Sequence, residues 1–72
     1  MSHINKNVTQ ARIKAITVHA HLHEMSPNQL VNHYRALVKQ RGISKAEKMA
    51  LQATLSYLRL CYRTMLKANK AA

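Results

Sequence analysis

The stretch SKAEKMALQATLSYLRLCYRTMLK, residues 44–67, decides the fold. It contains neither Pro nor Gly, and Ser44 followed by Glu47 forms a capping box, in which each side chain can bond the backbone amide of the other residue. Gly42, just before it, suits the left-handed conformation that ends a preceding helix. The stretch therefore predicts a long helix, which spans roughly 36 Å at about 1.5 Å per residue.

The apolar residues of this helix fall on two stripes rather than one. Both stripes recur at the three- and four-residue spacings of a helix. One contains Ala46, Ala50, Ala53, Tyr57 and Leu60, and the other contains Leu51, Leu55, Leu58, Tyr62 and Met65. We expect such a helix to be buried on two sides, with its tyrosines in the core.

A narrow polar strip without any acidic residue occupies the remaining side of the helix. It consists of Lys45, Lys48, Gln52, Ser56, Arg59, Arg63 and Lys70. Ordinary solvated helix faces mix charges of both signs, which pair at a spacing of four residues. On this strip the repulsion between the Lys and Arg side chains is almost uncompensated, and a polyanion would relieve it. The alternative interpretation is a solvated face without a partner.

A first helix is predicted over residues 8–25, capped by Thr9 or by Asn7. It also has two apolar stripes. One consists of Val8, Ala11, Ala15, Val18, Leu22 and Met25, and the other of Ile13, Ile16 and Ala20. Two apolar faces indicate that one chain alone does not bury this helix fully.

A second helix is predicted over residues 27–41. Ser26 is a favoured N-cap, Pro27 suits the first helical position, and Gln29 completes a capping box. The three segments predict an all-α fold: a small three-helix bundle with helices at about 8–25, 27–41 and 44–68. The long C-terminal helix is expected to be central. We expect one domain over residues 1–72, frayed at 1–7 and 69–72.

The short chain and its single cysteine favour an oligomer. A chain of 72 residues is near the lower limit for a self-sufficient core, and its lone Cys61 excludes an internal disulfide. We therefore expect homodimerisation to complete the bundle.

A cysteine inside an apolar helix suggests a buried thiol in a reducing compartment. No apolar run is long enough for a signal peptide or a membrane span, which predicts a cytoplasmic protein without membrane contact.

The charge balance points to partners. Twelve Lys and Arg against two acids give a formal net charge of +10, which suits nucleic acid, an anionic membrane or an acidic protein surface.

Enzymes need carboxylates, a poised base or an activated nucleophile, and this chain has no Asp and only Glu24 and Glu47. We expect no enzymatic activity and no cofactor. The caps and turns imply a folded bundle, which disfavours a membrane-lytic peptide.

The histidines of residues 19–23 are weak metal candidates. His19 and His23 lie four residues apart and can share a zinc ion on one helix face. Further ligands would have to come from Glu24, His33 or Cys61. Histidines at the solvated end of the helix, without metal, are the expected arrangement, and a pH-sensitive surface is a third interpretation.

A helix-turn-helix is an alternative interpretation, because Gly42 separates two predicted helices by a turn of suitable length. Aligning Gly42 with the turn glycine places Lys48 where a recognition helix buries an aliphatic residue, which disfavours this motif. Aromatic platforms that stack unpaired bases are not indicated either. The size, charge and layout resemble those of small regulators carried by phages and plasmids, but no motif assigns a family.

The sequence thus predicts a small, basic, non-enzymatic regulatory protein that binds DNA or RNA mainly through phosphate contacts. The expected binding residues are Lys45, Lys48, Gln52, Arg59, Arg63, Arg35, Lys39 and Arg41. The alternative is an adaptor or inhibitor that docks on an acidic surface of another protein, such as a host factor. Ile13, Ile16 and Ala20 are the predicted apolar anchor of that alternative.

Overall fold

Local capping signals place the starts of the second and third helices. A computed structural model of the chain describes residues 6–71, which form three helices: α1 (Lys6–Leu22), α2 (Pro27–Val38) and α3 (Lys45–Ala71). At α2 the capping box is complete, because the Gln29 amide donates to Ser26 Oγ and the Ser26 amide donates to Gln29 Oε1. At α3 the Glu47 amide donates to Ser44 Oγ (3.1 Å). The predicted all-α, three-helix class is confirmed for this part of the chain.

Helix α1 begins and ends earlier than predicted. It starts at Lys6, so Asn7 and Thr9 lie inside the helix and neither is its N-cap. It ends at Leu22 rather than Met25, because Glu24 adopts a left-handed backbone with φ of 55°. The Glu24 amide donates to the His21 carbonyl (3.0 Å) and the Met25 amide to the Ala20 carbonyl (2.9 Å). This pair of bonds is a Schellman motif, which closes the helix.

The other boundaries shift by a few residues. Helix α2 ends at Val38 rather than residue 41, and a loop containing Gly42, with φ of 83°, leads into α3. Gly42 thus has the expected left-handed conformation, although it lies beyond the helix end. Helix α3 continues to Ala71, so residues 69–71 are helical, as are residues 6 and 7. The remaining positions expected to fray, 1–5 and 72, lie outside the described residues.

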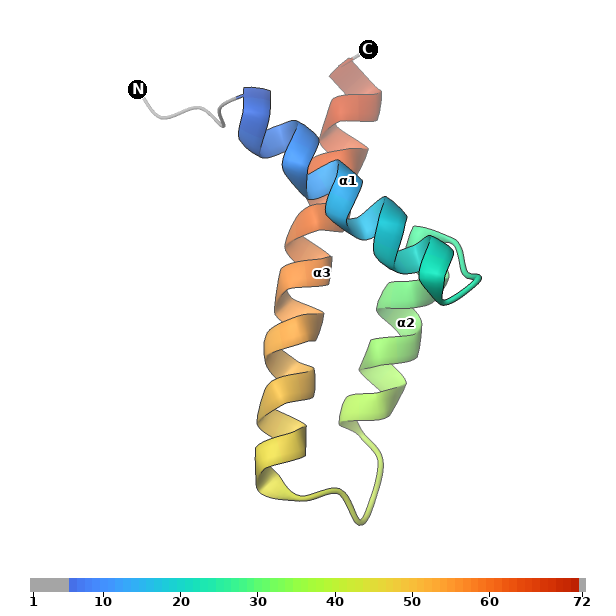
Figure 1. Ribbon diagram of the computed structural model, residues 1–72, viewed down its shortest axis with the longest axis vertical. Coiled ribbons are helices and arrows are strands. Elements are labelled where there is room, and N and C mark those ends of the chain that lie inside the picture. Colours follow the sequence, from blue (N-terminus) through green and yellow to red (C-terminus); the bar gives the residue numbers. More distant parts are fainter. Residues whose placement is uncertain (1–5, 72) are drawn as a thin grey trace.

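Helix α3 is the axis of the molecule, as predicted. Helix α2 runs antiparallel beside its N-terminal half, and α1 crosses its C-terminal half (Figure 1). The antiparallel pair α2–α3 is a helical hairpin, whereas the helices of a helix-turn-helix meet at about 90–120°. The structure therefore agrees with the rejection of that motif.

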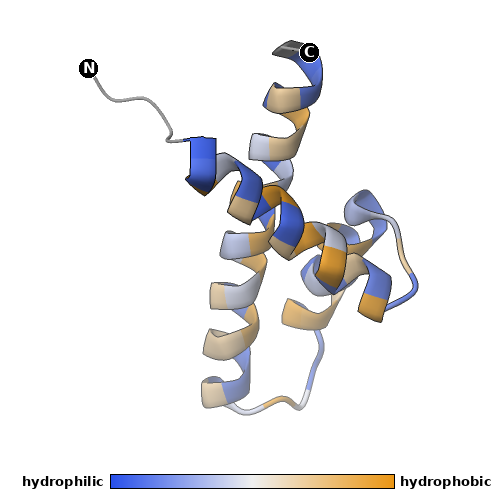
Figure 2. Ribbon diagram, turned by 45° about the horizontal axis from the view of Figure 1, so that its top comes forward, coloured by the Kyte–Doolittle hydropathy of each residue, from blue (hydrophilic) through white to orange (hydrophobic). Residues whose placement is uncertain are grey.

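The core lies where the three helices meet. Its buried apolar members are Ile16, Ala20, Leu30, Val31, Leu58 and Cys61. Partly buried neighbours pack around them, among them Tyr34, Tyr62 and Met65. Hydrophobic and hydrophilic residues alternate along all three helices (Figure 2), so each helix turns only part of its circumference to this core.

Each of the two doubly striped helices buries one stripe only. On α3 the buried stripe is the one that contains Leu58, while the stripe that contains Ala53 is exposed along its whole length. On α1, Ile16 and Ala20 are buried, whereas Val18 and Leu22 are 48% and 76% exposed. The expectation that α3 is buried on two sides is therefore wrong for the single chain, because two flanking helices cover only one side of it.

Candidate nucleic-acid interface

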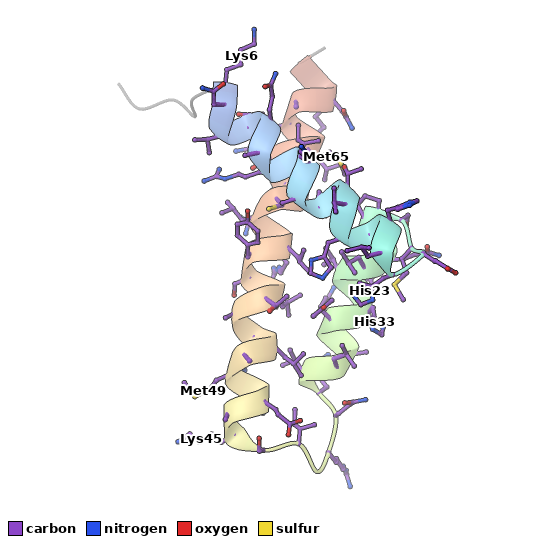
Figure 3. The ribbon with its side chains drawn as sticks, in the orientation of Figure 1. Lys6, His23, His33, Lys45, Met49 and Met65 are labelled. Atoms are coloured by element: carbon purple, nitrogen blue, oxygen red, sulfur yellow. The ribbon has the colours of Figure 1, made fainter. Side chains whose placement is uncertain are left out.

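The polar strip of α3 is fully displayed on the surface. Its predicted binding members are exposed side chains: Lys45, Lys48, Gln52, Arg59 and Arg63. They lie on one side of the helix because their spacings of three, four and seven residues return to nearly the same direction at about 100° per residue. Lys45, labelled in Figure 3, projects from the side of α3 that is turned away from α2.

This strip faces away from α1. Met65 lies where α1 crosses α3 (Figure 3) and is partly buried against the core. Arg63 precedes it by two residues, which places the arginine about 160° round the helix from Met65. Arg59, one turn earlier, shares the direction of Arg63. The strip therefore lies on the side of α3 opposite the crossing of α1.

Helix α2 adds cations to the same side. The rings of His33 and His23 lie 5.9 Å apart, which marks the side of α2 that faces the end of α1. Arg35 follows His33 by two residues and so points about 160° away, toward the side that the strip occupies. Lys39, at the end of α2, and Arg41, in the loop, are also exposed. We call the following eight residues the basic face: Lys45, Lys48, Gln52, Arg59, Arg63, Arg35, Lys39 and Arg41.

No acid interrupts the basic face. The two acids of the chain are Glu24, in the turn after α1, and Glu47. Glu47 is separated from Met65 by five full helical turns, so it points toward the α1 side of α3 and away from the strip. Within the described residues no bond returns from its carboxylate to the Ser44 amide, so only half of the predicted capping box forms. The carboxylate of Glu47 is thus exposed and free to meet a partner.

The histidines pack as rings. His19 and His23 stack at 5.2 Å with an interplanar angle of 6°, and both meet the edge of Tyr34. His19 Nε2 and the Tyr34 hydroxyl are joined by a hydrogen bond of 3.2 Å. His23 and His33 lie side by side between α1 and α2 (Figure 3).

These contacts do not make the predicted weak metal candidates into a ligand set. Among the described residues no group of three or more His, Cys, Asp or Glu side chains is placed to hold a metal ion. Of the further ligands considered, Cys61 is fully buried in the core and His33 belongs to the ring cluster.

The apolar anchor predicted for an adaptor is wrong. Ile16 and Ala20 are 0% and 2% exposed, because they form the side of α1 that packs on α3. Apolar side chains remain uncovered on α1, where Val18 and Leu22 are exposed, and along the first stripe of α3. Tyr57 there is 50% exposed, which corrects the expectation that all three tyrosines are core residues.

Tyr57 also brings in a residue that sequence reasoning missed. The Cys61 side chain, one turn along α3, raises the pKa of Tyr57 by hydrogen bonding and by the negative charge of its thiolate form, and partial desolvation adds to the rise. The positive charge of the Arg12 guanidinium of α1 lowers the pKa of Tyr57 and so opposes that rise, which indicates that Arg12 is close enough to act on the Tyr57 hydroxyl. Only the crossing of α1 over α3 brings these residues together, so no sequence spacing could have indicated it.

No family model, curated protein or solved structure matches this chain. None of the described helices is both long and apolar enough to cross a membrane.

Proposed function

We propose that this protein is a non-enzymatic nucleic-acid-binding regulator that contacts phosphates through the basic face. The observation that carries the proposal is the concentration of exposed Lys and Arg on the side opposite α1, with neither acid of the chain among them. A solvated surface gains nothing from such segregation, since like charges repel, whereas a polyanion neutralises it.

The dimensions suit a nucleic-acid duplex. The strip runs from Lys45 to Arg63, which corresponds to roughly 27 Å along a helix that rises about 1.5 Å per residue. That length approaches one turn of duplex, about 34 Å. Arg35 of α2 broadens the face to one side, so the cations can follow a backbone rather than meet a single phosphate.

Phosphate contacts would dominate the affinity. Each neutralised phosphate of duplex DNA contributes about 0.9 to the slope of log K against log salt, through release of counterions. Gln52 is the one neutral residue of the basic face with an amide that can read a base edge. We therefore propose weak or shape-based specificity, for DNA or RNA, in place of a base-by-base code.

The test compares two variants of equal net charge. Arg59→Gln/Arg63→Gln removes two cations from the basic face, and Lys6→Gln/Lys14→Gln removes two exposed cations from α1. Binding to a duplex DNA and to a structured RNA is measured over a range of salt concentrations. We expect the first variant to lose affinity and to lower the salt slope by about 2, because two phosphate contacts disappear.

The α1 variant is expected to bind nearly as the wild type does. Equal losses in both variants would mean that net charge, and not this face, attracts the polyanion. Absence of binding by the wild type to either nucleic acid at low salt would refute the proposal.

A second candidate function is an adaptor that docks on an acidic protein. The exposed apolar stripe of α3 favours it, because an apolar anchor beside cations matches an interface with an apolar centre and an acidic rim. Such docking would be sensitive to Tyr57→Ser, whereas binding through phosphates would be nearly indifferent to that change.

The proposal includes a homodimer and a cytoplasmic location. The few buried residues support the dimer, since a chain of this size rarely stabilises itself without a second copy, a metal or disulfides. The buried free thiol of Cys61 supports a reducing compartment.

A further inference from the structure

The exposed stripe of α3 has the pattern of a helix–helix seam. Its members follow one another at steps of four, three, four and three residues: Ala46, Ala50, Ala53, Tyr57 and Leu60. This is the spacing of a and d positions in a coiled coil. Tyr57 and Leu60 are 50% and 38% exposed, and Met49, which borders the stripe, is 60% exposed (Figure 3). The seam lacks a partner within the described chain.

The stripe is complementary to itself in size. Its N-terminal half carries only alanines, and its C-terminal half carries Tyr57 and Leu60. In an antiparallel pair related by a two-fold axis near Ala53, the alanines of each copy lie opposite the large side chains of the other. A parallel pair would set Tyr57 against Tyr57 and leave alanine opposite alanine. Close packing therefore favours the antiparallel arrangement.

Charge is complementary in the same arrangement. Lys45 and Glu47, the two neighbours of Ala46, lie about 100° to either side of the stripe. Glu47 is on the α1 side, with a carboxylate that no cap engages. Arg12, one turn before the buried Ile16, is half-buried on the side of α1 that packs on α3, and its charge acts on Tyr57. Because the antiparallel two-fold axis brings Ala50 opposite Tyr57 of the second copy, it brings Glu47 within about one turn of Arg12 of the second copy.

We propose that a second copy of this chain occupies the stripe, as an antiparallel α3–α3 dimer closed by two Glu47–Arg12 ion pairs. The two-fold axis runs from the α1 side to the opposite side of the molecule. It therefore leaves both basic faces on one side of the dimer, where they form a continuous cationic surface. The inference rests on the dimer included in the proposed function, and the role of that surface rests on the proposed binding of nucleic acid.

The affinity of this dimer is expected to be modest. A seam of two heptads between two helices is at the small end of specific interfaces, below about 1,200 Å² in total. Each copy also carries a net charge of +10, so the two copies repel each other at low salt. We therefore expect a weak dimer, because interfaces below about 1,200 Å² are typical of transient complexes.

Sedimentation equilibrium tests the interface. The wild-type mass is expected to rise from 8.2 kDa toward twice that value as the concentration increases to millimolar. Ala53→Glu, at an exposed position, should remain monomeric with an unchanged circular dichroism spectrum, because it places two carboxylates at the centre of the seam. A constant 8.2 kDa mass for the wild type, or dimerisation of folded Ala53→Glu, would overturn the proposal.

A charge swap tests the register. Glu47→Arg and Arg12→Glu should each weaken dimerisation by about tenfold, because each change turns two attractive pairs into repulsive ones. The double variant should regain most of the wild-type association. If it does not, the antiparallel register is wrong, since in a parallel pair the two residues are far apart.

Cysteine cross-linking gives a second measure that does not depend on charge. A mixture of Ala46→Cys and Leu60→Cys chains should form a mixed disulfide under mild oxidation, and Ala46→Cys alone should not cross-link. The opposite result would indicate a parallel pair and overturn the proposal. The Arg59→Gln/Arg63→Gln chain, with an intact stripe, should still dimerise while its nucleic-acid binding falls, so the two proposals can fail separately.

Discussion

At the scale of single residues, Glu24 is the position where the local sequence and the backbone disagree. It has a φ of 55°, the left-handed region in which a side chain other than that of glycine is strained. The Schellman bonds of Glu24 and Met25 hold it there, and Met25 packs against the core cluster that includes Ala20. Tertiary packing thus compensates for a conformation that the residue alone disfavours.

We predict that Glu24→Gly stabilises the protein by about 1 kcal/mol, because glycine adopts the left-handed conformation without a steric cost. Urea unfolding of dilute protein measures the effect. Glu24→Ala is the matched control, since it also removes the charge but keeps the Cβ atom. Equal stability of the glycine and alanine variants would show that the backbone at residue 24 stores no strain.

At the scale of elements, the packing of α1 against α2 depends on polar aromatic rings. His19 and Tyr34 are joined by a 3.2 Å hydrogen bond, and His23 and His33 complete a cluster of rings whose centroids lie 5.2–5.9 Å apart. At this end of α1, Ala20 and Met25 pack into the core, whereas Leu22 and His23 of the terminal turn are exposed. The ring cluster therefore adds to the core contacts that hold the end of α1 against α2.

We predict that Tyr34→Phe lowers the free energy of unfolding by about 1 kcal/mol, since it removes the hydroxyl that bonds His19. Tyr62→Phe is the control, because Tyr62 is similarly half-buried but its hydroxyl has no hydrogen bond within the described chain. A double-mutant cycle of Tyr34→Phe with His19→Ala should give a coupling of about 0.5–1.5 kcal/mol. A coupling energy near zero would mean that the His19–Tyr34 hydrogen bond does not stabilise the packing of α1 against α2.

At the scale of the whole molecule, the small core limits stability. The described chain extends over 43 × 29 × 17 Å, a shape too flat to enclose many side chains. Domains of this size unfold with roughly 0.05–0.15 kcal/mol per residue, or about 4–11 kcal/mol in total. Single core positions therefore carry a large share of the stability, and association with a second copy adds to it by mass action.

Leu58 and Leu60 of α3 show the difference in stability between a core position and an exposed position. Leu58 is 1% exposed, and we predict that Leu58→Ala lowers the free energy of unfolding by about 2–5 kcal/mol through the cavity it leaves. Leu60→Ala, two residues along the same helix, should cost less than about 1 kcal/mol in dilute protein, because Leu60 remains partly in water. Thermal unfolding at two protein concentrations measures both. Similar losses in dilute protein would contradict the assignment of the core to the Leu58 side.

The sequence by itself determined the number of helices, their approximate limits and the acid-free strip. These features are local: a capping box, a proline at N1 and a helical period each act within a few residues. For the same reason the exposed side chains of Lys45, Arg59 and Arg63 could be predicted from spacing alone. The end of α1 was missed because the left-handed residue there is a glutamate, which carries no glycine signal.

Only the tertiary structure decided which of two equivalent apolar stripes each helix buries. Periodicity shows that Ile16 and Val18 lie on different faces of α1, but both faces are apolar and the free energy of burial depends on what the neighbouring helices cover. The crossing of α1 over α3 buries Ile16 and Leu58 and leaves the Ala53 stripe in water. It also places Arg35 on the side of Arg63. Contacts between helices distant in sequence set these positions, and a local pattern does not contain them.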